Sequence, residues 1–328
     1  MKIYDFAIDW PERLTNDDFF INALKAECKR RRLSFIFIGK GALKSYTEGV
    51  KKGNIRIKFY LDMASETFVP KDKFNRFAYC LKDSGTKVVA DPDDVREAAD
   101  KSITHFDLLT AKIRVPYTVV IRNWAPTKRL SFHERRRLGL PFVIKPALGY
   151  GQKGVKIINR RRPLKDMAQA RRFDRGDNFL LQEFIQPAEL GGLSAWFRVY
   201  HLFGEIIPCW WDPRTHANRQ VTLREMHEYQ LLPLVRIASE IAHLTHIEWF
   251  SCEIALSRKS RKFVTIDYMN DQCAIYPKSR HKDGMADDLI MHIAERMVDK
   301  AWYFIKSKPT LNFRALWFPR IKTRDEDA

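Results

Sequence analysis

The residues best suited to chemistry form a short segment in which one lysine precedes three glycines. Lys145 ends an apolar run, Gly149, Gly151 and Gly154 follow, and a β-branched run then continues to Ile158. This pattern predicts two strands joined by a glycine-rich turn, and successive backbone N–H groups in such turns bind anions. The segment is a candidate clamp for the phosphates of a nucleotide, and an ordinary hairpin with flexible glycines is the competing interpretation.

The glycines spell G-x-G-x-x-G, a spacing that also occurs in dinucleotide-binding proteins and protein kinases. The dinucleotide motif requires a helix directly after the third glycine, whereas Val155–Ile158 continues as a predicted strand. A kinase loop has its lysine on a later strand and is followed by H-R-D and D-F-G signatures, and the sequence contains neither. The phosphate clamp is therefore of another kind.

A second group of candidate residues consists of acids and an amide near the end of the chain. Glu253 lies among apolar neighbours in a predicted strand, where an unpaired carboxylate is costly. Asp267, Asn270 and Asp271 follow on the next predicted strand, and this set of oxygen ligands suits Mg²⁺ bridged to phosphates. The alternative is that Glu253 pairs with an arginine and that the later acids belong to a turn.

The elements that must position these residues follow from hydrophobic periodicity and capping signals. Alternating helices and strands in the first hundred residues predict a small α/β unit with a largely parallel sheet. Further along, strands dominate and predict antiparallel pairs, two of them joined at Gly204 and two carrying the acids at their ends. We expect strands at 33–38, 55–60, 87–90, 117–121, 179–185, 196–202, 205–210, 249–256 and 262–266, and helices at 18–28, 93–100, 102–112, 166–172, 231–244 and 286–305.

Together these residues resemble the ATP-grasp superfamily of glutathione synthetases, D-alanine ligases and ribosomal-protein glutamate ligases. The resemblance runs from about Lys87 to Val298 and includes Thr104-His105 and Val115–Thr118. It implies an α/β (α+β) fold with an N-terminal α/β lobe, a central hairpin lobe and a C-terminal antiparallel lobe, with ATP between the last two. The corresponding divisions of the chain are 1–101, 102–190, 191–305 and a basic then acidic tail at 306–328.

The resemblance also implies a role for individual positions. Lys145 matches the lysine that binds ATP phosphates, Arg198 the arginine against the transferred phosphoryl group, and Glu189 the acid that holds the ribose. Gln182–Ile185 falls where the family reads the adenine base. The nucleotide-binding set is then Lys101, Lys145, Gly149, Gly151, Gly154, Gln182, Glu183, Phe184, Ile185 and Glu189, with Lys145 and Arg198 as catalytic residues.

The implied metal ligands are Glu253, Asp267 and Asn270, and here the sequence departs from the family pattern. The family commonly writes Glu-x-Asn, whereas Asp267 and Asn270 lie three residues apart and leave Asp271 as a rival ligand. The implied cofactors are ATP and Mg²⁺, with Mn²⁺ as a substitute. The metal stoichiometry and the ligand set stay open at this point.

The implied activity is that of a carboxylate–amine, or carboxylate–thiol, ligase that forms an acylphosphate from an amino acid, a peptide or another small acid. Lysine and arginine cations around ATP would allow a carboxylate to approach the γ-phosphate without prohibitive repulsion. Arg214, Lys278 and Arg280 are candidates for recognising the substrate carboxylate, because a guanidinium presents two parallel donors to it.

Composition leaves two other functions open. The formal net charge of +18 suits nucleic acid or another anion as a partner, but no helix-turn-helix, zinc-finger or RNA-recognition signature accompanies the basic blocks. A phosphotransferase could use the same clamp. The five cysteines form no C-x-x-C pair and no apolar run reaches about 20 residues. We therefore expect a cytoplasmic protein without a membrane partner, and a homo-oligomer is compatible with the sequence.

Overall fold

The N-terminal unit is a parallel four-stranded sheet with helices on both faces. The computed structural model describes residues 1–10, 18–69, 71–122, 130–149, 154–159 and 177–307. The sheet has the order β2-β1-β3-β4 with every pair parallel, which confirms the largely parallel sheet expected from the sequence. Its strands are β1 (Lys2–Asp9), β2 (Phe35–Ile38), β3 (Ile55–Leu61) and β4 (Lys87–Val89).

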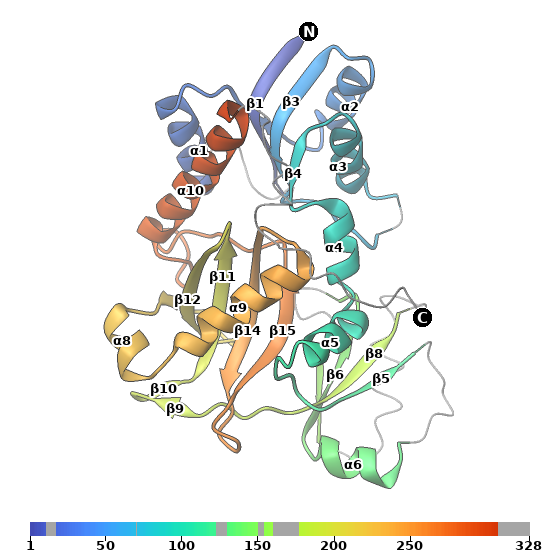
Figure 1. Ribbon diagram of the computed structural model, residues 1–328, viewed down its shortest axis with the longest axis vertical. Helices are drawn as coiled ribbons and strands as arrows, with labels where there is room; N and C mark the ends of the chain where they lie inside the picture. The colour runs from blue at the N-terminus through green and yellow to red at the C-terminus, as the bar shows by residue number, and fades with distance from the viewer. Residues whose placement is uncertain (11–17, 70, 123–129, 150–153, 160–176, 308–328) are drawn as a thin grey trace, which may run out of the picture.

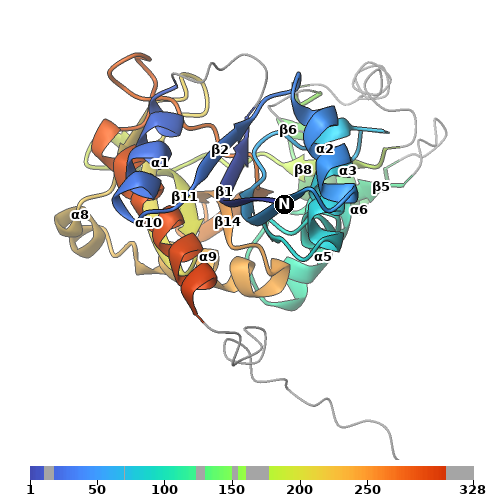
Figure 2. The same ribbon diagram turned by 90° about the horizontal axis from the view of Figure 1, so that it is seen from above.

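Two helix pairs cover the faces of this sheet. The first pair is α1 (Phe19–Arg30) and α10 (Asp287–Lys306), and the second is α2 (Leu43–Lys51) and α3 (Lys73–Asp83). Figures 1 and 2 show the sheet between the two pairs. The side chains of β3 alternate accordingly, since Phe59 and Leu61 belong to the core under α1 and α10 while Tyr60 belongs to the core under α2 and α3. The last described helix of the chain is thus part of the first layer.

The α1 helix begins where the sequence indicates. The Asp18 carboxylate accepts hydrogen bonds from the Phe20 and Ile21 amides at 2.8 and 3.3 Å, which satisfies two of the free donors of the first turn. Strand β1 and the helices α2 and α3 were not predicted. The α2 helix has no side-chain cap to mark its start, so its first turn leaves little trace in the sequence.

Two antiparallel sheets form the rest of the molecule. One has the order β5-β8-β6-β7 and the other the order β13-β12-β11-β14-β15. Figure 1 shows α9 lying across the second sheet and α5 beside the first. The strands are β5 (Thr118–Ile121), β6 (Phe142–Pro146), β7 (Lys156–Ile158), β8 (Phe179–Glu183), β9 (Glu189–Leu190), β10 (Leu193–Ser194), β11 (Trp196–Leu202), β12 (Glu205–Trp211), β13 (Asn218–Gln220), β14 (Trp249–Leu256) and β15 (Phe263–Asn270). The helices are α4 (Pro92–Ala98), α5 (Lys101–Thr110), α6 (Phe132–Leu138), α8 (Leu223–Glu228) and α9 (Leu232–Thr245).

The predicted hairpin around the glycines is present. Strands β6 and β7 pair antiparallel, with Phe142 opposite Ile158 and Ile144 opposite Lys156. Two boundaries differ from expectation: β15 continues to Asn270, so Asp267 lies within the strand, and β8 ends at Glu183. The predicted helix at 166–172 lies outside the described residues. In the described part of the chain, no helix is both long and apolar enough to cross a bilayer.

Candidate functional site

A cleft of about 840 Å³ lies between the two antiparallel sheets and collects most of the residues singled out in the sequence. Its walls come from β6 and β8 on one side and from β14 and β15 on the other, joined by the segment that follows β8. Of the predicted site residues, those that line it are Lys101, Lys145, Gly149, Gln182, Glu183, Phe184, Ile185, Glu189, Arg214, Glu253 and Asp267. Segments far apart in the sequence therefore meet at one cavity.

Three charged residues form a row across three neighbouring strands, and two of them, Glu253 and Asp267, line the cleft. Arg198 on β11 is opposite Glu253 on β14, and Glu253 is opposite Asp267 on β15. Directly opposed residues of antiparallel strands have Cβ atoms about 5 Å apart on the same face. The Arg198 guanidinium donates to one Glu253 oxygen, and the Trp196 indole N–H donates to the other at 3.0 Å. The expected alternative, a Glu253–arginine pair, is therefore present inside the site itself.

A β-bulge accommodates the unusual spacing of Asp267 and Asn270. Ser251 and Glu253 are two residues apart on β14, whereas their partners Asn270 and Asp267 are three apart on β15. The extra residue of the bulge offsets the odd spacing on β15. Asn270 therefore lies opposite Ser251 and Asp267 opposite Glu253, and these two β14 residues share one face of the sheet. Asn270 lies beyond the residues that line the cleft, and Asp271 lines a separate small cavity with Asp62.

Arg198 is mostly covered by its neighbours, and its buried Nε atom keeps one hydrogen-bond donor free for an anion. Its guanidinium stacks on the Trp211 ring, 3.7 Å from the ring centroid. The neighbouring Glu253 carboxylate raises the pKa of Arg198 even though burial opposes this. The Nε atom is buried and has no hydrogen-bond partner among the described residues. An unpaired buried donor of this kind is rare in proteins and fits an oxygen of a bound phosphate.

Lys145 is a buried cation on the opposite wall. Its Nζ atom donates to the Ile266 carbonyl at 2.8 Å and lies 4.9 Å from the centroid of the Tyr268 ring. Burial lowers the pKa of Lys145 from 10.5 to about 8, because Asp267 and Glu253 only partly offset the lost hydration. An anion brought close to this ammonium would gain a strong partner and would raise the pKa of Lys145 again.

No protein-family model matches the chain, and no curated protein matches it in sequence. Solved structures do match it in three dimensions. A RimK-domain ATP-grasp protein from Sphaerobacter thermophilus is 17% identical, with a TM-score of 0.62 over 90% of this chain and 98% of that one. A D-alanine–D-alanine ligase from Bacillus anthracis, solved with ATP, is 13% identical, with a TM-score of 0.63 over 94% of this chain and 100% of that one. The ATP-grasp ligase PsnB, solved with a minimal precursor, Mg and ADP, is 11% identical, with a TM-score of 0.57 over 90% and 98%.

The chain has the ATP-grasp fold. The agreement covers nine tenths of its length and extends to the N-terminal layer as well as to both antiparallel sheets. The resemblance inferred from the lysine, the glycines and the acids is confirmed at the level of the fold.

The ATP-grasp cleft narrows at a connecting segment that joins its two sheets. Downstream of β8, the Arg258 amide donates to the Gln186 carbonyl at 2.8 Å and the Ala188 amide donates to the Leu256 carbonyl at 2.7 Å. Within the described part of the chain, the backbone groups of Phe184 and Ile185 form no hydrogen bond to other backbone groups. These groups line the cleft and are available to the edge of a nucleotide base.

A buried polar network supports this end of the ATP-grasp cleft from below. The Gln182 amide nitrogen donates to the Thr118 hydroxyl at 3.0 Å and to the Tyr268 hydroxyl at 2.8 Å, and His105 Nδ1 lies 2.7 Å from the same tyrosine oxygen. Burial, with the nearby Lys145 charge, lowers the pKa of His105 to about 4, so the imidazole is neutral at pH 7. The Gln182 side chain therefore ties β8 to β5 and β15.

The remaining predicted residues take different positions around the ATP-grasp cleft. Lys101 Nζ donates to the Gly149 carbonyl at 2.7 Å, which places a cation at the start of the glycine segment. Arg214 lines the cleft with an exposed side chain that also contacts Asp212. Gly154 lies in the turn two residues before β7 and does not line the cleft. Lys278 and Arg280 lie on an exposed loop outside it, and Gly151 lies outside the described residues.

Sequence reasoning missed the aromatic residues that hold the charged groups. Trp196 donates to Glu253, Trp211 lies under Arg198, and the Tyr268 ring lies beside Lys145. Of the two adjacent tryptophans on β12, Trp210 packs in the core against Phe197. The alternation of side chains along a strand could have indicated this. Because successive residues of β12 point to opposite faces, Trp211 faces away from the side that Trp210 occupies and toward Arg198.

The donor set around Glu253 and Asp267 fits a magnesium ion bridged to phosphates. No cluster of three acids, histidines or cysteines in the described part of the chain could hold a metal alone. Mg²⁺ commonly uses only one or two carboxylates and takes its other ligands from phosphates and water. A carboxylate has about four lone-pair positions, so Glu253 keeps acceptor capacity after bonding to Arg198 and Trp196.

Proposed function

We propose that the protein is an ATP- and Mg²⁺-dependent ligase that joins a carboxylate to an amine, or to a thiol, through an acylphosphate. The observation that carries the proposal is the convergence of Lys145, Glu253 and Asp267 on one cleft of about 840 Å³, with Arg198 paired to Glu253. Backbone groups free to bind a base lie along the connecting segment of the same cleft. Two of the structures with this fold named above are ligases, one solved with ATP and the other with Mg and ADP.

ATP would lie with its base along the connecting segment and its phosphates between the two walls. Phe184 and Ile185 would offer backbone donors and acceptors to the base, and Glu189 would accept hydrogen bonds from the ribose hydroxyls. Lys145 would bind the phosphates from one wall and Arg198 from the other. The free Nε donor of Arg198 suits the phosphoryl group being transferred, because charge-assisted donors are strongest where negative charge accumulates.

The reaction would proceed in two displacements. A substrate carboxylate oxygen attacks the γ-phosphorus, the bond to the bridging oxygen breaks, and ADP leaves. An amine or thiol then attacks the acyl carbon, phosphate leaves with the electron pair, and the nucleophile loses a proton. Glu253 and Asp267, with Asn270 beside them, would hold Mg²⁺, which when bound neutralises phosphate charge. The chain's own contribution is to bring two anions together between fixed cations.

The substrate is proposed to be a small carboxylic acid, an amino acid or a peptide. Arg214 lines the cleft with a largely exposed guanidinium that can pair with a carboxylate through two parallel hydrogen bonds. PsnB, which has a similar fold, was solved with a minimal precursor, and the D-alanine–D-alanine ligase is named for a small amino acid. Both substrate sizes therefore occur on this fold.

The decisive experiment is a nucleotide-dependent thermal shift measured with and without Mg²⁺. The wild type should be stabilised by ATP or ADP with Mg²⁺, and Glu253→Gln should lose the Mg²⁺-dependent part. Glu228→Gln, on the exposed face of α8, is the matched control and should behave as wild type. Absence of any Mg²⁺-dependent nucleotide stabilisation in the wild type would refute the proposal.

The substrate class is tested by release of ADP and phosphate over a panel of amino acids, dipeptides and other small acids. A ligase should release ADP only when an acid is present and should trap hydroxylamine as a hydroxamate. ADP release without any acid would instead indicate an ATPase or a phosphotransferase.

A further inference from the structure

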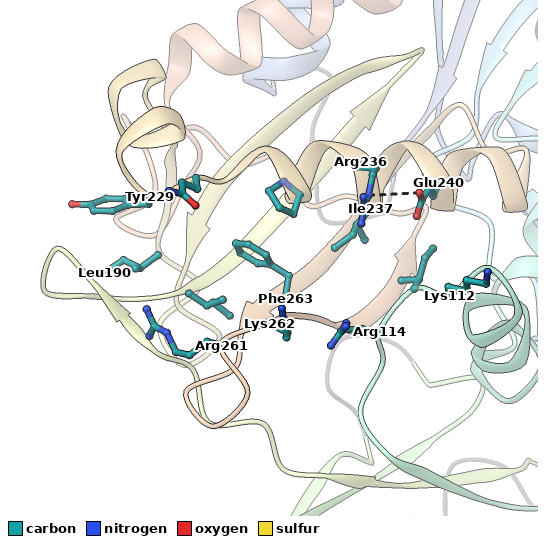
Figure 3. A pocket seen from close by; sticks show the side chains of 14 residues that line it. Lys112, Arg114, Leu190, Tyr229, Arg236, Ile237, Glu240, Arg261, Lys262 and Phe263 are labelled. Atoms are coloured by element: carbon teal, nitrogen blue, oxygen red, sulfur yellow. Dashed lines mark ion pairs between the residues drawn. The ribbon is translucent and has the colours of Figure 1, made fainter.

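A second cavity, of about 520 Å³, lies on the other side of the β14–β15 turn from the nucleotide cleft. Figure 3 shows Arg261, Lys262 and Arg114 along one side of it and Arg236 on α9 opposite. Its basic residues come from three separate parts of the chain: the segment after α5, the helix α9, and the β14–β15 turn. The full basic set is Lys112, Arg114, Arg236, Arg261 and Lys262.

The charge around this cavity is almost entirely positive. Glu240 is the acid that lines it, and its carboxylate lies 3.7 Å from the Arg236 guanidinium. Within the described residues, Lys112, Arg114 and Lys262 have no ion pair. Gathering like charges around one concavity raises the local potential and concentrates anions there. The electrostatics of the cavity therefore suit a ligand with more than one negative charge.

Two of the cations occupy backbone positions that favour glycine. Lys112 has a φ of 61° and Arg261 a φ of 53°, and Gln230, which also lines the cavity, has a φ of 52°. The left-handed conformation costs a residue with a side chain about 1 kcal/mol. Placing long cationic side chains at such positions, where glycine would be easier, is consistent with a use for the charges they carry.

The floor of the cavity is apolar. Ile113, Ile237 and Leu256 are buried, and Phe263 and Leu190 complete the surface. Figure 3 shows Phe263 and Ile237 between the two basic sides. Pockets of about 300 to 1,000 Å³ hold small molecules, usually on an apolar lining with a few polar contacts that fix orientation. Free inorganic anions alone would leave this floor uncovered.

We propose that this cavity binds a small organic polyanion, a molecule with an apolar or aromatic body that carries two or more phosphate or carboxylate groups. The apolar body would cover Phe263, Ile237 and Leu256, and the anionic groups would pair with Arg114, Lys262 and the other cations of the rim. The proposal is one of binding alone, with no bond of the ligand made or broken in this site.

The position of the cavity makes the ligand an effector rather than a second substrate. Phe263 is four residues from Asp267 on β15, which is about 13 Å along the strand. The reacting phosphates would therefore lie well away from it. Two contacts connect the sites: Arg261 lines both cavities, and β9 presents Glu189 to the nucleotide cleft and Leu190 to the second cavity. Binding at either site can thus alter the other, and such coupling is reciprocal.

The test uses 8-hydroxypyrene-1,3,6-trisulfonate, a fluorescent aromatic trisulfonate, as the probe. Its binding to the full chain is measured by fluorescence anisotropy at fixed ionic strength. Arg114→Glu and Lys262→Glu should each raise the Kd about tenfold, equivalent to about 1.4 kcal/mol. Lys259→Glu is the matched control because it makes the same charge change on the same exposed turn without lining either cavity. It should leave the Kd within about twofold of wild type.

A titration with ADP and Mg²⁺ separates this cavity from the nucleotide cleft. As ADP is raised, the apparent Kd of the probe should reach a plateau, since two sites can be occupied together. An apparent Kd that rises in proportion to ADP would place the probe in the nucleotide cleft and overturn the proposal. Equal weakening by Lys259→Glu and Lys262→Glu would also overturn it, because binding would then follow surface charge alone. Neither result depends on ligase activity, so the proposed function is tested separately.

Discussion

Replacing Lys145 with methionine should stabilise the nucleotide-free protein and weaken nucleotide binding. Methionine keeps the length and apolar stem of lysine and removes the buried charge. Burial lowers the pKa of Lys145 from 10.5 to about 8, and each pKa unit corresponds to about 1.4 kcal/mol. At pH 7, below both pKa values, burial of this charge therefore lowers the free energy of unfolding by about 3 kcal/mol. Loss of the hydrogen bond to the Ile266 carbonyl lowers the stability of the variant by about 1 kcal/mol and so offsets part of this gain.

The expected gain is about 2 kcal/mol, or about 4 °C in the Tm of a protein of this size. The pH dependence gives a sharper measurement. Because the folded-state pKa lies below the unfolded value, the unfolded chain binds more protons between pH 8 and 10.5, and Lys145 makes stability rise with pH over that window. Lys145→Met lacks this contribution. The difference in the free energy of unfolding between the variant and the wild type should therefore shrink by about 2 kcal/mol between pH 8 and 9.5.

Nucleotide binding should change in the opposite sense. Truncating a buried charge contact commonly costs about 2 to 5 kcal/mol. ADP at 100 times the wild-type Kd stabilises the wild type by about 2.7 kcal/mol, whereas a Kd raised about a hundredfold leaves about 0.4 kcal/mol. Urea unfolding and thermal scans, with and without Mg-ADP, measure both effects. A lower Tm of the nucleotide-free variant, together with an unchanged response to ADP, would refute both ideas: that the buried Lys145 charge destabilises the fold and that it binds the phosphates.

Three other substitutions test separate parts of the structure. Glu253→Gln leaves the Arg198 guanidinium buried without its anion and should lower the free energy of unfolding by about 3 kcal/mol in urea; an unchanged midpoint would show that the pair contributes nothing. Gln182→Leu removes the amide that bridges two hydroxyls and should cost about 1 to 3 kcal/mol, and a variant as stable as wild type would contradict that network. Gly284→Ala places a Cβ 2.6 Å from the Tyr276 carbonyl oxygen and should destabilise by about 2 kcal/mol, which circular dichroism melting can check.

The elements that could be predicted from sequence are those with a local signal. The β6–β7 hairpin combines β-branched runs with glycines, and the α1 helix starts at a capping aspartate. The helix α2 lacks a side-chain cap. The strand β15 was predicted to end at Ile266. Backbone pairing with β14 carries it past Asp267 to Asn270 although Asp267 and Glu253 repel each other, and the nearby Lys145 ammonium offsets part of that repulsion.

The candidate site was predictable as a set of residues but not as a geometry. Lysine, arginine and acid types are visible in the sequence, and their convergence follows once the fold is known. The bulge that brings Asn270 opposite Ser251 depends on the register of two strands, which no local pattern specifies. Likewise, the position of Trp211 under Arg198 depends on how β12 pairs with β11. Arg258 and Arg261 reach the cleft because their turn docks on the connecting segment.

The packing of α10 on α1 and the first sheet has a consequence for synthesis of the chain. Residues 287–306 supply one side of a core that also contains α1, strands of the first sheet and side chains from residues 200–285. While the ribosome is making the intervening two hundred or so residues, the apolar face of α1 has no permanent cover. The N-terminal layer can therefore be completed only after residues 287–306 have been translated, and a nascent chain halted before Asp287 should be a preferred client of chaperones that bind exposed apolar surface.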